Sequence, residues 1–590
     1  MSDTDAIALA GARVRAVTGL DQDQASQDND SAEYSSASNP KQEPASPQAE
    51  TQSCEGMPAH QELQNEAAPS EVSSQAASEQ TEVELKLLVD HARLANFNEA
   101  SIMATNARDK GTRKRMKAIY YDTPERTLWR NGLTLRVRQS GARFVQTMKA
   151  QPAGDPLRRG EWEASVPSIA PDIALAMPFI PGKLRSELGQ RGLEAVFTAD
   201  ICRHLRVVDL PSGTVEVAFD QGFLRSGDRT MPVSEIELEL KRGSAAAIYE
   251  LALRLAEHGP VKPSIRSKAA RGFDLAVDTP PPARKPRKLH LDASISLDAA
   301  FACILNSCQQ HLLESLPAAE DGRDAEGIHQ LRVALRRIRS AIDLMRFADS
   351  PSKLDQLRSE AKWLARGLSA ARDWDIFHGK TLPTIAKGCA SIKGFDTLAQ
   401  FAENCRSAGY REARLALSDP RCAHFVLGLG AWIEERGWRG EVAADGLARL
   451  AEPAINFASG MLSVQHAKVL KRGRHFKSLA VEERHRLRLA VKKLRYVADF
   501  LLPLYGDRKS ARRYSDKLTE LQKDLGFYND IATTGSLLVG LGVESGDSAT
   551  AAAAIAGWQA HAMIGIEAHL RDAWRDFAKT KAPWLRDTEE

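Results

Sequence analysis

The chain has 590 residues, of which 43% are hydrophobic and 27% are charged, and its net charge at pH 7 is +3. This length exceeds what one hydrophobic core organises, so two or three domains are expected. The sequence predicts neither a membrane span nor a secretory signal. Its seven cysteines form no C-x-x-C pair, which argues against zinc and disulfide frameworks and favours a cytoplasmic setting.

Residues 1–80 form an acidic segment of low complexity. They hold three Lys/Arg and fourteen Asp/Glu, a net charge of −11, and one aromatic residue, Tyr34. We predict that this tail is disordered, because its apolar surface is too small to offset the entropy of ordering. Residues 81–590 carry the compensating net charge of +14, which favours an anionic partner for the body of the protein.

Residues 81–278 contain short segments in which polar and apolar residues alternate, typical of antiparallel β-structure with a few helices. Residues two apart in a strand share a face, and here the charges on each face are sorted by sign. The sorted sets are Glu82, Glu84 and Lys86; Arg136 and Arg138; Lys149; Arg203; Glu216 and Asp220; and Glu235, Glu237 and Glu239.

A solvated sheet face is the ordinary explanation for any single strand of this kind. Three glutamates at two-residue spacing, however, repel one another unless a cation lies among them. A closed sheet with an apolar exterior and a polar lumen accounts for both faces. Arginines suit phosphate oxygens and carboxylates suit hard divalent ions, so this lumen favours a complex of metal and polyphosphate.

The ordered set E-x-E-x-K (82–86), LxLRxR (133–138), TMK (147–149), EWE (161–163), E-x-E-x-E (235–239) and SKAARG (267–272) resembles the CYTH, or triphosphate tunnel metalloenzyme, superfamily. The resemblance implies an eight-stranded tunnel that hydrolyses or cyclises triphosphates with Mg²⁺ or Mn²⁺. It implies phosphate contacts from Lys86, Arg136, Arg138, Lys149, Arg203 and Lys268. It further implies a metal on Glu237 and Glu239, and a second metal or the attacking water on Glu82 and Glu84, so that the first strand is catalytic.

The sequence leaves the roles of several other residues in this region open. The pattern does not fix the faces of Arg158, Arg206 and Arg271. Glu235 suits a structural pairing with a lysine as well as metal contact, Asp220 suits the orientation of an arginine, and His204 is expected in a structural role opposite Arg203. No aromatic cluster stands out among the tunnel residues, which favours inorganic triphosphate; the superfamily's adenylate cyclases and thiamine triphosphatases keep an organic triphosphate as the alternative.

Residues 279–290 include the proline-rich basic run TPPPARKPRK, which is typical of a linker. Residues 291–590 lack strand alternation and show long segments with a period of 3.6 residues, which predicts an all-helical domain. HQLRVALRRIRSAIDLM (329–345) is repeated as HRLRLAVKKLRYVADFL (485–501). This repeat predicts two related helical halves.

Each copy of the repeat places a histidine and three basic residues on one helix face. The two stripes are His329, Arg332, Arg336 and Arg339, and His485, Arg488, Lys492 and Arg495. One such stripe is usually a solvated face, but its recurrence in two diverged copies favours a salt-sensitive site for a linear polyanion.

The region resembles the CHAD domain, the conserved histidine α-helical domain, which implies binding of inorganic polyphosphate. Arg337 and Lys493 are expected to add charge at a flank, and Asp373 and Asp530 to fix the fold by pairing with arginines. Nucleic acid is a weaker alternative, because the stripes lack the exposed aromatic residues expected for single strands. A polyphosphate scaffold without catalysis is the alternative to hydrolysis.

Overall fold

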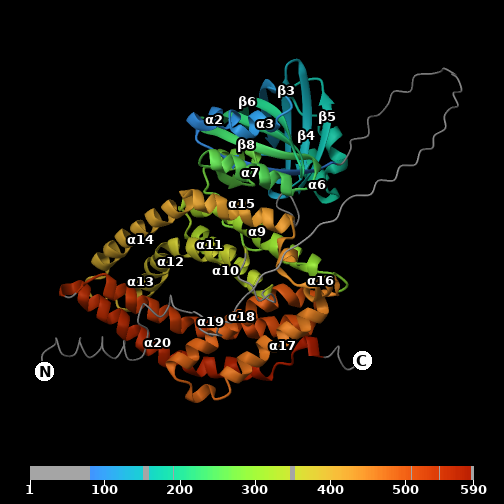
Figure 1. Cartoon of the computed structure of the whole chain (residues 1–590). Helices are drawn as coiled ribbons and strands as arrows, with labels where there is room; N and C mark the ends of the chain where they lie inside the picture. The colour runs from blue at the N-terminus through green and yellow to red at the C-terminus, as the bar shows by residue number, and fades with distance from the viewer. Residues whose placement is uncertain are drawn as a thin grey trace, which may run out of the picture. The chain divides into compact units, whose positions relative to one another are not determined.

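The computed structural model describes residues 80–150, 158–190, 192–345, 353–506, 508–543 and 545–585 (Figure 1). The acidic tail predicted over residues 1–80 therefore lies outside the described residues, except for Gln80. The side chains of Glu82 and Arg158 are also outside the described part, although their backbones belong to the first and fifth strands. Among the described residues, no helix is both long and apolar enough to cross a membrane.

The N-terminal domain is built on antiparallel strands that close into a ring. The described strands are β1 (Gln80–Leu88), β2 (Thr112–Asp122), β3 (Leu133–Ser140), β4 (Arg143–Ala150), β5 (Arg158–Val166), β6 (Glu194–Leu210), β7 (Gly213–Ser226), β8 (Arg229–Gly243) and β9 (Lys262–Ser264). Neighbours follow the order β5-β4-β3-β2-β6-β7-β8-β1, and β1 also pairs with β5. The predicted closed sheet of eight strands is confirmed. A ninth strand, β9, adds to β1 and is too short for its alternation to be recognised.

Helices cover this ring. They are η1 (His91–Arg93), α2 (Leu94–Asn98), α3 (Ser101–Asn106), α4 (Thr127–Arg130), α5 (Ile173–Ala176), η2 (Met177–Phe179), α6 (Gly182–Gln190), α7 (Ala246–His258) and α8 (Lys268–Val277). They lie on its outer face, except α8, which packs against inner-face residues such as Tyr120 and Ala199. Leu85 and Leu238 are fully buried in one cluster with α7, which lies along the sheet near β8 (Figure 1). Val137 is fully buried in a second cluster with α5 and α6. Since successive side chains alternate, the charged neighbours of these residues face the lumen.

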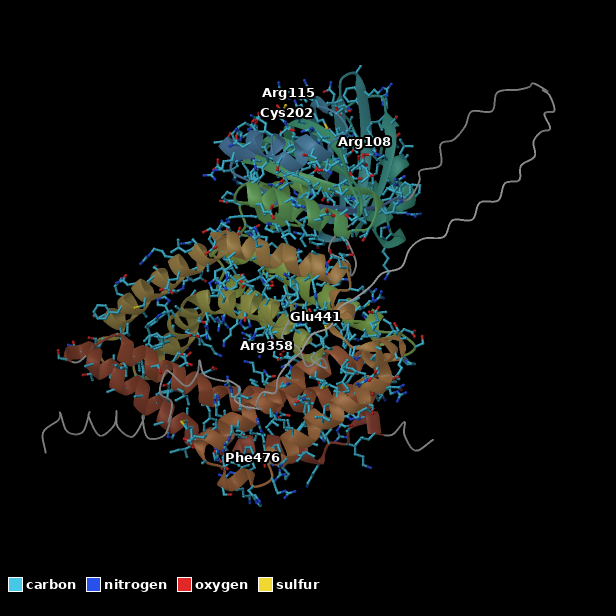
Figure 2. All side chains as sticks on the ribbon, in the orientation of Figure 1. Arg108, Arg115, Cys202, Arg358, Glu441 and Phe476 are labelled. Atoms are coloured by element: carbon cyan, nitrogen blue, oxygen red, sulfur yellow. The ribbon has the colours of Figure 1, made fainter. Side chains whose placement is uncertain are left out.

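Charged side chains on the outside of the ring pair locally. Arg115 of β2 donates to Asp200 of β6 at 2.9 and 3.0 Å, and the exposed Cys202 lies opposite Arg115 in the strand register (Figure 2). Arg108 pairs in the same bidentate way with Asp209. The outer face therefore carries paired charges of both signs.

The C-terminal domain is helical, as predicted. Its elements are α9 (Leu297–Asp321), α10 (Ala325–Leu344), α11 (Lys353–Gly367), α12 (Ser369–Ile376), η3 (Phe377–Thr381), α13 (Leu382–Gly388), α14 (Phe395–Ser418), α15 (Pro420–Glu434), η4 (Gly437–Glu441), α16 (Ala444–Ala451), α17 (Ala454–Arg472), η5 (Phe476–Ser478), α18 (Val481–Leu501), η6 (Leu502–Tyr505), α19 (Lys509–Gly540), α20 (Gly546–Lys579) and η7 (Pro583–Leu585). The long helices α19 and α20 lie side by side (Figure 1).

The internal repeat corresponds to α10 and α18. The apolar positions Leu331, Leu335 and Ile338 are fully buried in the first copy, and the equivalent Leu487, Val491 and Leu494 are fully buried in the second. α10 packs on α9, α18 packs on α17, and α10 and α18 contact each other. The prediction of two related helical halves is therefore confirmed.

One prediction about these helices is wrong. Arg337 is expected to add charge toward a flank of the stripe, but it is 7% exposed. Its guanidinium lies over the ring of Phe500 at 5.6 Å and donates to Ser307 Oγ at 3.2 Å. A long cationic side chain can pack its stem and planar head against an aromatic ring, and here that packing takes Arg337 out of the surface stripe.

Gly272 of α8 provides a test of how tightly this helix fits the sheet. A Cβ at this position would lie 2.1–2.4 Å from three ring carbons of Phe197. Gly272→Ala should lower the free energy of unfolding by about 1–3 kcal/mol through overpacking. Denaturant titration followed by circular dichroism measures this.

Gly557→Ala is the matched control, because a Cβ there meets nothing within 4 Å in helix α20. It should leave stability unchanged or raise it, since alanine favours a helix by roughly 0.5–1 kcal/mol over glycine. Equal stability of the two variants would contradict the packing described for α8.

Candidate functional site

The closed sheet encloses a cavity of about 1300 Å³. Every predicted tunnel residue whose side chain the structure describes lines this cavity. They are Glu84, Lys86, Arg136, Arg138, Lys149, Arg203, Glu237, Glu239 and Lys268. They come from β1, β3, β4, β6, β8 and α8, so residues far apart in the sequence converge on one polar space.

A row of three carboxylates crosses one wall of the cavity. Glu239 of β8 is the register partner of both Glu84 on β1 and Glu216 on β7, and all three line the cavity. Lys241 Nζ lies 2.7 Å from Glu239 and 3.3 Å from Glu216. Directly opposed like charges destabilise a sheet, so this row favours a bound cation.

A second carboxylate group surrounds a lysine. The Nζ atom of Lys268 lies 2.5 Å from Asp220, 2.5 Å from Glu235 and 2.9 Å from Glu237. Burial opposes the charge on Lys268, but these three carboxylates outweigh it and raise the pKa of the lysine. Burial likewise opposes ionisation of Glu237, yet Lys268, Lys86 and Arg203 hold its pKa well below the usual range.

The residues with open assignments now have defined contacts. Asp220 accepts two hydrogen bonds from Arg203, at 2.7 and 2.6 Å, so it orients that arginine. Glu235 is fully buried and pairs with Lys268 and with Arg271. Arg206 points away from the lumen and donates to backbone carbonyls of Asn98, Met103 and Asp109.

The wall opposite the carboxylates is cationic. Strand β3, which carries Arg136 and Arg138, lies four strands from β8 around the ring in either direction. Lys149 of β4 lies beside it, in register with Thr134. Arg138 donates to Glu163 at 3.3 Å, and Thr147 donates to the same carboxylate at 3.0 Å. The cavity therefore separates a basic wall from an acidic one.

The prediction that no aromatic cluster stands among the tunnel residues is wrong. Tyr120 and Trp129 both line it. Tyr120 stacks on Phe197 with centroids 4.3 Å apart, and Trp129 stacks on Phe273 with centroids 4.6 Å apart. The cavity also includes Glu163 and Glu216, which belong to the sequence patterns but had no assigned role. Its further lining residues, outside those patterns, are Lys241, Arg266, Arg284, Lys285 and Arg287.

In the helical domain, the basic stripes of the two repeats converge. Arg336 of α10 donates to the Tyr496 hydroxyl of α18 at 3.1 Å. Burial lowers the pKa of Lys492 to about 7, and four arginines of the two stripes, Arg336, Arg488, Arg332 and Arg339, add to this effect by repulsion. We call these five residues the cation cluster. It concentrates positive charge where the two halves meet.

The histidine and acidic residues near the cation cluster differ in their environments. Burial, with Arg372 and other cations nearby, lowers the pKa of His329 to about 4, so this ring is neutral at pH 7. Burial raises the pKa of Asp373 and of Asp530, against the opposing charges of Arg332 and Arg488 respectively. Asp375 forms the structural pair, accepting from Arg406 at 2.7 Å and from Tyr410 at 3.0 Å.

Comparison with known proteins places each domain in a family. A family model for the CYTH domain matches residues 80–273, and one for the CHAD domain matches residues 303–539. The chain is a fusion of a CYTH domain and a CHAD domain.

Relatives of both parts are known. A Haemophilus influenzae protein named inorganic triphosphatase is 30% identical over 157 residues, which cover 26% of this chain but only 44% of that relative. An uncharacterized Mycobacterium tuberculosis protein is 26% identical over 413 residues, covering 65% of this chain and 75% of that protein. The crystal structure of a CHAD domain from the plant Ricinus communis is 30% identical with a TM-score of 0.44, covering 51% of this chain and 98% of that one.

The CYTH cavity offers two groups of carboxylates that differ in their fitness for a metal. Asp220, Glu235 and Glu237 lie within 4.8 Å of one another but already surround Lys268. Glu84 and Glu239 are register partners that face the lumen, with Glu216 next to them. Lys86 contacts Glu84, and Lys241 contacts Glu239 and Glu216, so lysines pair with this row at its two ends, whereas Lys268 lies among all three carboxylates of the other group. The hard oxygen ligands of the row suit Mg²⁺ or Mn²⁺.

Lys492 provides a test of the CHAD cation cluster. Its pKa of about 7 lies well below the usual lysine pKa of 10.5, so the fold favours the neutral amine. Stability from this group is present above pH 10.5 and is lost as the pH falls toward 7. Lys492→Met should therefore raise the melting temperature more at pH 6 than at pH 9, by a few degrees, because ~1 kcal/mol corresponds to about 2–4 °C in a domain of this size.

Lys493→Met is the matched control on the same helix, because Lys493 is exposed. It should change the melting temperature equally at both pH values. If Lys492→Met gave the same shift at pH 6 and pH 9, the repulsion within the cation cluster would be excluded.

Proposed function

We propose that the CYTH domain hydrolyses inorganic triphosphate with a divalent cation and that the CHAD domain binds inorganic polyphosphate. The first part rests on one observation. In the same cavity, a basic wall with Arg136 and Lys149 lies opposite an acidic wall with Glu237 and Glu239. The name of the Haemophilus influenzae relative supports the same activity, over the 44% of its length that matches.

Each wall supplies a different part of the chemistry. The guanidinium groups of Arg136 and Arg138 suit bidentate contact with phosphate oxygens, and they stabilise negative charge that develops on phosphorus-bound oxygens. Glu84 and Glu239, with Glu237 beside them, would hold Mg²⁺ or Mn²⁺, and the ion would supply positive charge that offsets the charge of the phosphates. Lys86 pairs with Glu84 and lies 3.3 Å from Glu237, so it holds these two carboxylates in place.

The orientation of the cationic side chains is set by the carboxylates of the lumen. The side chain of Arg203 is 21% exposed, and two of its nitrogens donate hydrogen bonds to Asp220. Lys268 is 11% exposed and is held by three carboxylates. Such pre-organisation limits the side-chain entropy lost when a phosphate binds.

An organic triphosphate is the second candidate substrate, because Tyr120 and Trp129 line the cavity. Trp129 is half-buried and presents an aromatic surface on which a base or a thiazolium ring could stack. A panel of triphosphate, ATP and thiamine triphosphate therefore decides between the two classes. Formation of cyclic AMP from ATP would indicate cyclisation instead of hydrolysis.

The first functional prediction concerns Glu237. Purified full-length protein should release phosphate from triphosphate with Mg²⁺ or Mn²⁺ and should not do so in chelator. Glu237→Gln keeps the size of the side chain but removes its charge, and it should lower kcat by roughly 100-fold or more, as the loss of one transition-state contact does elsewhere. Colorimetric phosphate release measures both effects.

Asp200→Asn is the matched control, since this carboxylate of β6 pairs with Arg115 on the outside of the ring. It should retain full activity. Full activity of Glu237→Gln, or no metal-dependent release by the wild type, would favour a binding scaffold over an enzyme.

The second functional prediction concerns the CHAD domain. Arg332→Gln combined with Arg488→Gln removes one charge from each stripe, and should weaken binding of long-chain polyphosphate by roughly 100-fold. The reason is that each charge-assisted contact is worth about 1.5–3 kcal/mol. Filter binding at several salt concentrations measures how much polyphosphate the protein retains. This binding should also become less sensitive to salt.

The control for this experiment is Arg486→Gln combined with Lys493→Gln, two exposed positions on the same helix α18. Binding should be unaffected there. If both double variants weakened binding equally, the attraction would come from overall charge and the cation cluster would have no special role.

A further inference from the structure

The linker after the CYTH domain forms part of the cavity wall. α8 ends at Val277, its C-cap Asp278 has a left-handed φ of 51°, and several of the residues that follow line the cavity. The linker residues that line it are Pro281, Pro282, Ala283, Arg284, Lys285 and Arg287. A segment expected only to connect two domains therefore contributes three cations to the proposed active site.

Contacts with α9 fix this segment in place. The carbonyl of Arg284 lies 3.1 Å from Nε2 of His311, which is 2% exposed and also lies 3.2 Å from the Gln330 side-chain oxygen. Both partners are oxygen acceptors, so Nε2 carries the proton, and burial lowers the pKa of the ring to about 4. Arg287 donates to Glu314 of α9 at 2.8 Å. The prolines add stiffness by restricting φ.

Positive charge is concentrated at this end of the cavity. Burial lowers the pKa of Arg266, and repulsion from Arg271 and Arg284 adds to the effect, while Asp274 opposes it. Arg266, Arg284, Lys285 and Arg287 all line the cavity here. Asp274 and Glu314 also line the cavity and pair with Arg266 and Arg287, so four cations face two carboxylates here. This excess of positive charge favours a bound anion, because the anion relieves the repulsion between the cations.

The size of the cavity also exceeds what a triphosphate requires. Small-molecule sites that bury drug-sized ligands occupy about 300–1,000 Å³. This cavity is about 1300 Å³ and continues from the strands to the linker. A longer chain of phosphates could therefore extend from the strand cations to the linker cations without leaving the cavity.

We propose, on the basis of the proposed triphosphatase function, that Arg284, Lys285 and Arg287 form a distal subsite for linear polyphosphates. The strand residues hold the three phosphates at the reacting end, and the linker subsite holds the phosphates beyond the third. The preferred substrate class is accordingly a short linear polyphosphate longer than triphosphate. The linker, which sequence reasoning treats as a spacer, sets the chain-length preference of the enzyme.

Lysine footprinting tests the position of the bound chain directly. The full-length protein with Mg²⁺ is acetylated briefly on ice, with excess linear pentaphosphate, with excess triphosphate or with neither. Lys285 and Lys288 are both exposed, but only Lys285 lines the cavity. At pentaphosphate ten times its Kd, acetylation of Lys285 should slow about tenfold by mass action, whereas triphosphate should have little effect. Lys288 is the internal control and should react at one rate throughout.

Kinetics of a linker variant provide the second readout. Arg284→Gln, Lys285→Gln and Arg287→Gln are combined, and kcat/KM is measured for pentaphosphate and for triphosphate. The ratio of the two values should fall about tenfold, since one charge-assisted hydrogen bond is worth that much. Lys288→Gln should leave the ratio as it is in the wild type.

The outcomes separate this inference from the proposed function. Triphosphate turnover with an unprotected Lys285 and an unchanged ratio overturns the subsite and leaves the triphosphatase assignment standing. Protection of Lys285 by pentaphosphate without hydrolysis of either substrate supports the subsite and overturns the assignment. Equal protection of Lys285 by triphosphate and pentaphosphate means that the linker is not specific for longer chains, and also overturns the inference.

Discussion

The organisation of the N-terminal domain depends on how carboxylates are compensated inside a closed sheet. Glu84, Glu216 and Glu239 occupy one row across three strands, where their charges repel. Lys241 offsets this row from one end, and Lys268 and Arg203 offset the next carboxylates along the strands. Burying such charges without partners is costly, so each charged side chain of the lumen depends on the opposite charges around it. Cations and carboxylates are thereby held at fixed positions around an open space.

Closure of the ring is what makes this arrangement possible. β1 pairs with β8 on one side and with β5 on the other, so the first strand completes the barrel. The same strand places Leu85 and Leu87 in the outer core and Glu84 and Lys86 in the lumen. Because of this alternation, one face of β1 packs against α7 and the other face lines the lumen. A shift of register by one residue would exchange the two faces and destroy both.

The sequence was sufficient for the fold and for the membership of the cavity where alternation was clear. Strands such as 235–239 carry charge at every second position, so their inner face could be assigned. The sequence could not place Tyr120 in the cavity. Ile119, Tyr120 and Tyr121 are consecutive apolar residues, so both faces of the strand are apolar there and the pattern does not show which side chain faces the lumen. The surroundings of Lys268 and Arg337 depend on partners far along the chain, on other strands and helices. The position of the linker along the cavity could not be predicted for the same reason, since its neighbour His311 lies on α9.

The cations of the two domains are compensated in opposite ways. In the CYTH cavity most described cations are held by carboxylates, so a bound phosphate must compete with internal pairs such as Arg203 with Asp220. In the CHAD cluster Lys492 is repelled by four arginines, so a bound anion relieves strain between like charges. Tight ground-state binding accelerates nothing by itself, whereas contacts that strengthen as charge develops do. Internally paired cations therefore suit the turnover that we propose for the CYTH domain, and the mutual repulsion in the cation cluster suits the retention that we propose for the CHAD domain.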